Sequence, residues 1–122
     1  MAIPQGVRHV EVAVELAGHA AEAISKLEGL EEAWRAEAVE RLAATTDLLR
    51  ATLDRFCLKT RVCLPFARRC EEEARLLDGL LAELGAQDTS DLQPRLVAAM
   101  EALVKAARTL DERSLMQGMA IT

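Results

Sequence analysis

Small or apolar residues recur at steps of three and four over residues 39–84, and this seam constrains the fold more than any other feature. A repeat of about 3.5 residues sustained over such a length is typical of helices packed lengthwise. The seam positions are Val39, Leu42, Thr46, Leu49, Leu53, Phe56, Thr60, Cys63, Ala67, Cys70, Ala74, Leu77, Leu81 and Leu84. The segment is therefore predicted to be helical and to pack against other helices.

Pro65 interrupts this seam and leaves two arrangements open. Proline disrupts a helix interior, suits the first helical turn, and disfavours helical torsions at the residue before it, Leu64. The first arrangement is a corner between helices over residues 30–60 and 65–84. The second is one long helix over residues 30–84 kinked at Pro65, whose uncovered faces would require dimerisation to complete a bundle. We expect the corner, although residues 57–69 contain no Gly, Asn, Asp or Ser to form a turn.

Two further helices with wide apolar stripes are predicted over residues 6–28 and 92–116. Gly29 is expected to end the first of them, and residues 86–90 are expected to form the loop before the last. Ala, Leu, Glu and Arg dominate the composition, and all four favour helix. The predicted fold is an all-α antiparallel four-helix bundle in a single domain of residues 1–122.

Composition and charge narrow the class of protein. The chain is 51% hydrophobic and 29% charged, which is typical of a folded amphipathic protein. The N-terminal residues lack the apolar region of a secretory signal, and no run is long enough to cross a membrane. Three cysteines, an odd number, fit a reducing compartment better than a disulfide framework. We expect a cytoplasmic protein with unpaired cysteines, and a net charge of −5 argues against nucleic-acid or membrane binding.

One region, the basic corner at residues 55–70, differs in charge from the rest of the chain. Residues 55–69 contain five cations and no acid. Neighbouring cations stabilise thiolates, so this corner is the candidate anion or redox site. The residues concerned are Arg55, Lys59, Arg61, Arg68, Arg69, Cys57, Cys63 and Cys70.

The cysteine spacing favours a structural role over a reactive one. Cys63 and Cys70 occupy seam positions, where cysteine behaves as a small buried hydrophobic residue. Cys57 and Cys63 are six residues apart, which places them on different helix faces unless a turn intervenes.

Neither a metal site nor catalytic machinery is expected. Glu11, Glu15, His19 and Glu22 follow one another along one helix face, but the Glu-x-x-His motif of carboxylate-bridged metal bundles is absent from the sequence. We interpret the row as a solvated acidic face. No phosphate-binding glycine loop and no nucleophile–base pair stands out, so we expect no cofactor and no enzyme activity.

The sequence favours a non-enzymatic interaction module of the adaptor, chaperone or regulatory-subunit type, binding a protein partner or a second copy as a homodimer. The wide apolar faces and the uncharged C-terminus are the basis for this expectation. The expected interface residues are Val97, Met100, Val104, Leu115, Met116, Met119 and Ile121. The alternative is a regulatory bundle that senses an anion or a redox change at the basic corner.

Overall fold

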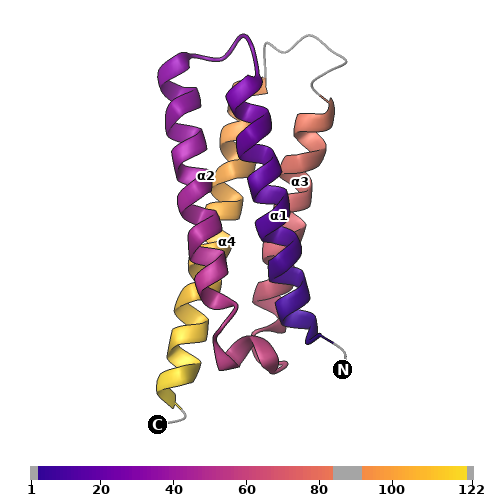
Figure 1. The fold of residues 1–122 in the computed structure, drawn as a ribbon, viewed down its shortest axis with the longest axis vertical. Helices are drawn as coiled ribbons and strands as arrows, with labels where there is room; N and C mark the ends of the chain where they lie inside the picture. The colour runs from indigo at the N-terminus through magenta and orange to yellow at the C-terminus, as the bar shows by residue number, and fades with distance from the viewer. Residues whose placement is uncertain (1–2, 84–91, 121–122) are drawn as a thin grey trace.

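The computed structural model describes residues 3–83 and 92–120, with side chains described for residues 3–83 and 93–116, and it confirms an all-α antiparallel four-helix bundle (Figure 1). The long helices are α1 (Gln5–Lys26), α2 (Glu32–Thr52), α3 (Leu64–Glu83) and α4 (Leu92–Ala120). A short 3₁₀-helix, η1 (Phe56–Lys59), lies between α2 and α3. No described helix is long and apolar enough to cross a membrane.

The connection between α2 and α3 crosses the bundle diagonally. The four main helix–helix interfaces are those of α1 with α2, α1 with α3, α3 with α4, and α2 with α4. Successive helices run in opposite directions, so α1 and α3 run side by side in the same direction, as do α2 and α4 (Figure 1).

Several of the buried residues of α1 and α3, two helices that pack against each other, are small. Ala13, Ala17 and Ala20 of α1 and Ala67 and Ala74 of α3 are buried. Small side chains let two helices approach closely, because the distance between helix axes depends on the residues at the contact. Larger core side chains come from all four helices and from η1: Val10, Ile24, Leu42, Leu49, Leu58, Leu77, Leu96, Met100, Leu103 and Leu110.

A corner, and not a kinked helix, separates the two halves of the seam. Helix α2 ends at Thr52, eight residues before the predicted end at residue 60, and the chain re-enters a helix at Leu64 with Pro65 in the first turn. The kinked continuous helix is therefore wrong, because the chain reverses direction between α2 and α3. Phe56, expected in the seam, is exposed in η1.

The other helix boundaries lie close to the predicted ones. Helix α1 ends at Lys26, and Gly29 adopts a φ of 88° in the turn that follows. Helix α3 ends at Glu83, and α4 continues four residues beyond residue 116, to Ala120. The loop predicted over residues 86–90 lies outside the described residues.

Candidate functional site

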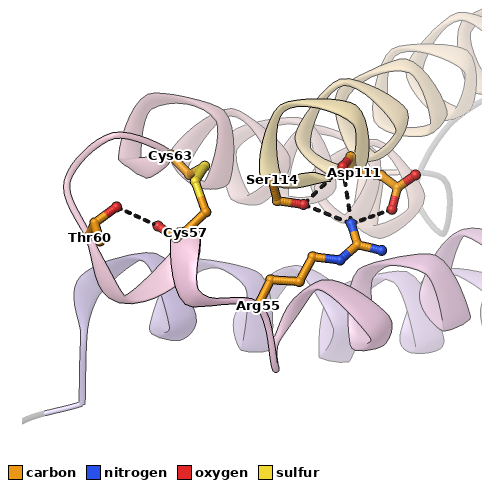
Figure 2. The surroundings of a disulfide bond; sticks show 6 residues. All are labelled: Arg55, Cys57, Thr60, Cys63, Asp111 and Ser114. Carbon is orange, nitrogen blue, oxygen red and sulfur yellow. Dashed lines mark hydrogen bonds and ion pairs between the residues drawn. A yellow bond between two sulfur atoms is a disulfide. The ribbon is translucent and has the colours of Figure 1, made fainter. Parts of the chain in front are cut away.

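A disulfide bond joins Cys57 of η1 to Cys63, the residue before α3 (Figure 2). Their Cα atoms are 5.8 Å apart, and both side chains are buried. The expectation of unpaired cysteines is therefore wrong for these two residues. The physical reason is the turn through η1, which brings together two residues that one straight helix would hold on different faces.

Arg55 joins the corner to α4 instead of facing solvent as a free cation. Its Nη1 donates to the carbonyl oxygen of Asp111 at 3.0 Å, to the Asp111 carboxylate, and to Ser114 Oγ at 2.7 Å (Figure 2). Arg55 and Asp111 are each only about one-fifth exposed, and Ser114 is buried. Sequence reasoning missed Asp111 and Ser114, because nothing in the local pattern indicates which residue of α4 lies opposite the corner.

The remaining cations of the basic corner do not form one site. Arg69 pairs with Glu73 of the same helix at 3.1 Å. Lys59, Arg61 and Arg68 are exposed and have no ion pair among the described residues. Lys59 and Arg61 share one hollow, which the start of α1 also lines.

Cys70 is a buried packing residue in the middle of the core. Removal from water, with a smaller contribution from the nearby Glu73 carboxylate, raises the pKa of its thiol to about 12. A thiol with such a pKa is protonated at neutral pH and is a poor nucleophile. Of the three cysteines, the pair at the corner is therefore the one with redox chemistry available.

The predicted partner interface is only partly on the surface. Met100 and Val104 are 2% and 7% exposed and belong to the core, so their assignment to the interface is wrong. They are buried because α4 packs against both α2 and α3. Val97 is half-buried, and Leu115 and Met116 are exposed. The side chains of Met119 and Ile121 lie outside the described part of the chain.

A groove follows the outer side of the α3–α4 interface, and we call it the α3–α4 groove. It consists of two hollows of about 380 and 450 Å³. The hollow nearer the corner is lined by Phe66, Arg69, Glu73, Ala102, Lys105, Ala106 and Thr109. The hollow farther from the corner is lined by Arg75, Leu76, Gly79, Leu80, Glu83, Arg95, Ala98 and Ala99.

The two hollows follow one another along the same stripes of α3 and α4. Positions 66, 69, 73, 76, 80 and 83 of α3 are three or four residues apart, so they form one stripe along the helix. Positions 95, 99, 102, 106 and 109 form the matching stripe on α4. The two stripes run antiparallel and extend along most of the length of α3.

The α3–α4 groove combines an apolar floor with charged walls. The alanines of α4 and Gly79 of α3 have little or no side chain, so they leave the groove open between the two helices. Leu76 is 63% exposed although it is a large apolar residue. At the corner end, the guanidinium of Arg113 lies 5.4 Å from the centre of the Phe66 ring, a distance at which a cation and an aromatic face attract each other.

The acidic row of α1 is a solvated face, as the sequence indicates. Glu11, Glu15, His19 and Glu22 are all exposed, and among the described residues no cluster of potential metal ligands occurs.

The other histidine, His9, has a structural partner that sequence reasoning missed. Its Nδ1 lies 3.2 Å from Glu71 Oε1 of α3. Burial raises the pKa of this carboxyl, but hydrogen bonds and charge from His9 and Arg75 outweigh it, so the pKa of Glu71 is lowered.

No protein-family model, curated protein or solved structure matches this chain. Its function therefore has to be inferred from its own residues.

Proposed function

We propose that this chain is a non-enzymatic helical-bundle interaction module, an adaptor, chaperone or regulatory subunit, that binds a helix of a partner protein in the α3–α4 groove. The observation that carries the proposal is the groove itself, in which an exposed Leu76 stands beside a floor of alanines along most of α3. Exposed apolar surface arranged in a continuous stripe is characteristic of interaction sites.

The dimensions of the groove suit one helix. Phe66 and Leu76 are ten residues apart on α3, which is about 15 Å at 1.5 Å per residue. A docked amphipathic helix presents anchors at i, i+3, i+4 and i+7, so three turns of a partner span both hollows. The partner is a second protein or another copy of this chain, and the experiment below distinguishes the two.

Leu115 and Met116 form a competing surface near the end of α4. Met116 is 59% exposed, close to the value for Leu76, but it lines neither hollow of the α3–α4 groove. Met116 is therefore the matched control for Leu76.

Site-specific photo-crosslinking in the producing cells tests this proposal. A photoreactive residue at Ala102, on the floor of the groove, is expected to crosslink a defined protein, whereas one at Gly18, on the open face of α1, is not. Mass spectrometry of the crosslinked peptide identifies the partner or a second copy of the chain.

Substitutions at Leu76 and Met116 then test whether the groove binds the crosslinked protein. Leu76→Gln should abolish the crosslink and Met116→Gln should preserve it. Equal crosslinking from residues 102 and 18, or loss of the crosslink with Met116→Gln alone, contradicts the proposal.

The Cys57–Cys63 disulfide supports a second candidate, a redox-sensing corner. Exchange with a dithiol reductant would transfer two electrons and two protons to this pair, releasing two thiols and leaving the reductant as a disulfide. If the same corner binds an anion, Lys59 and Arg61 are the cations available for it, because Arg55 and Arg69 are in ion pairs and Arg68 does not line the hollow that Lys59 and Arg61 share.

Hydrogen exchange on the oxidised and reduced proteins tests this candidate. A sensor requires a reversible change within the folded state. Backbone amides of residues 55–60 are expected to exchange at least about tenfold faster after reduction, while those of α1 and α3 keep their protection. Unchanged exchange at the corner contradicts a sensing role.

A further inference from the structure

We infer that the partner segment in the α3–α4 groove is an acidic amphipathic helix, with its apolar face on the alanine floor and its carboxylates chiefly against the cations of the α4 wall. This inference rests on the proposed function and adds the chemical class of the partner.

The charge of the groove is opposite to that of the chain. Four cations line its two hollows, Arg69 and Lys105 in one and Arg75 and Arg95 in the other, and two carboxylates accompany them. The lining therefore carries 4 − 2 = +2, whereas the whole chain carries −5, which leaves −7 elsewhere. Complementary charge raises the association rate and excludes wrong partners, so an anionic segment is favoured in this groove and a cationic one is not.

The cations on the α4 wall are the ones available to a partner. Lys105 is exposed and has no ion pair among the described side chains. Arg95 approaches Glu83 only to 3.7 Å, and both side chains are well exposed, so that pair contributes little. Arg95 and Lys105 are ten residues apart, about 15 Å along the helix, so two carboxylates about three turns apart on a docked helix would meet both.

The cations on the α3 wall are less available to a partner than those on the α4 wall. This difference determines which wall the partner's carboxylates face. The Glu73 carboxylate is only 12% exposed and already pairs with Arg69, and Arg75 pairs with Glu71 at 3.2 Å. We therefore place the partner's carboxylates chiefly on the α4 side and its larger apolar side chains on the α3 side, beside Phe66 and Leu76.

The floor of the groove favours a helix over other anionic partners. Ala99, Ala102 and Ala106 are three or four residues apart, with Ala98 beside them, and none carries a side chain beyond Cβ, so a second helix can approach α4 closely. A nucleic acid or an anionic bilayer would meet the same four cations, but the −7 on the rest of the chain repels an extended polyanion. A short acidic helix avoids that repulsion because it contacts the groove alone.

Peptide binding tests the inference on the intact protein. The probe is a fluorescent synthetic peptide of about 18 residues, with Leu at helical spacing on one face and Glu on both flanks, and the comparison peptide has Lys in place of every Glu. We expect the acidic peptide to bind at least about tenfold more tightly than the basic one, and the difference to shrink as salt is raised.

Two matched variants locate the binding site. Lys105→Glu should weaken binding of the acidic peptide by about fivefold or more. Arg108→Glu makes the same charge change three residues away, in the separate hollow between α2 and α4, and should weaken binding less than Lys105→Glu does, because Arg108 does not line the groove. Circular dichroism of both variants verifies that the bundle is folded.

The remaining outcomes of the peptide and crosslinking experiments lead to different conclusions about the partner. If both peptides bind equally and Leu76→Gln weakens both, the inference is wrong and the proposed function stands. If neither peptide binds while the crosslink from residue 102 persists, the partner is not an acidic helix. If an oligonucleotide or phosphatidylserine vesicles bind more tightly than the acidic peptide and depend on Lys105, the partner belongs to another class and the inference is overturned.

Discussion

The two connections at opposite ends of α2 are held in different ways. Between α1 and α2, Gly29 adopts a φ of 88°, a backbone conformation that glycine reaches without strain. Between α2 and α3, residues 53–63 contain Asp54 but no Gly, Asn or Ser, and none of them has a positive φ. That corner is held by the Cys57–Cys63 disulfide, by Arg55 bound to α4, and by η1 packed against α1.

This difference shows that a chain can reverse direction without a glycine or a residue of positive φ when distant contacts supply the constraint. The turn at Gly29 depends on one residue and its own torsions. The corner depends on α1 and α4, so its stability should respond to substitutions far from it in sequence. Five predictions test this contrast, from the largest expected effect to the smallest.

Gly6→Ala should destabilise the protein most. A Cβ at this position would lie 2.6 Å from the backbone carbonyl oxygen of Leu58 in η1, so the corner or α1 would have to move. We expect the free energy of unfolding to fall by about 2–3 kcal/mol in urea denaturation.

Gly18→Ala is the matched control, because a Cβ there meets nothing within 4 Å. It should raise the free energy of unfolding by about 0.5–1 kcal/mol through helix propensity alone. Equal effects of the two substitutions would mean that the corner does not rest against α1.

Reduction of the Cys57–Cys63 disulfide should lower the free energy of unfolding by about 2 kcal/mol, the value expected for cross-linking so short a loop. Urea denaturation with and without a phosphine reductant measures the difference. The double variant Cys57→Ala/Cys63→Ala should be insensitive to the reductant. If that variant responds as the parent does, the effect has another origin.

Arg55→Met should cost about 1.5 kcal/mol, because it leaves the largely buried Asp111 carboxylate without its partner. Arg50→Met removes an exposed contact with Asp47 at 3.7 Å and should cost less than about 0.5 kcal/mol. Thermal unfolding compares the two variants. Similar losses would show that the contact between the corner and α4 is no stronger than a surface ion pair.

Gly29→Ala should cost about 1 kcal/mol, because an L side chain at a φ of 88° is strained even where space is open. Gly29→Asn should recover part of the loss, since asparagine tolerates this region better than alanine. Urea denaturation checks the order Gly, Asn, Ala. A neutral Gly29→Ala would mean that this turn, like the corner, is held by contacts from elsewhere.

Glu71→Gln should have the smallest effect, about 0.5 kcal/mol at neutral pH, because the carboxylate is partly exposed. Glu71 ties α3 to His9 of α1, and its pKa is lowered in the folded protein. A lowered carboxyl pKa stabilises the folded state above the ordinary value of about 4.5, and the contribution is lost as the pH falls through the folded-state pKa. Parent and variant should therefore converge in acid, and a difference that persists there would exclude this carboxylate as its source.

The helices and most of the core were predictable from the sequence, because both follow from periodicity. Leu42, Leu49 and Leu77 were placed in the seam and are buried. Phe56 was wrongly predicted to lie in the packed seam. The 3.5-residue pattern of the sequence continues through residues 53–63, although these residues are not part of an α-helix. Met100 and Val104 were assigned to a partner interface, because a sequence does not say how many neighbours a helix has within its own chain.

The sequence predicted which residues belong to the basic corner, but not which of them are in contact. The sequence indicates that residues 55–70 are basic and contain cysteines, but not that Cys57 meets Cys63 or that Arg55 reaches Asp111. The α3–α4 groove has no local signature, since its two walls are separated in sequence and each wall alone is a mixed face of charged and apolar residues.

The sequence by itself determined that this chain forms four amphipathic helices, because a 3.5-residue repeat can bury its apolar side chains only along a helical seam. The tertiary structure alone decided how α2 connects to α3, which cations are neutralised and where a groove remains. Those features depend on which residues the packing of all four helices brings together, as it brings Arg55 to Asp111, 56 positions away.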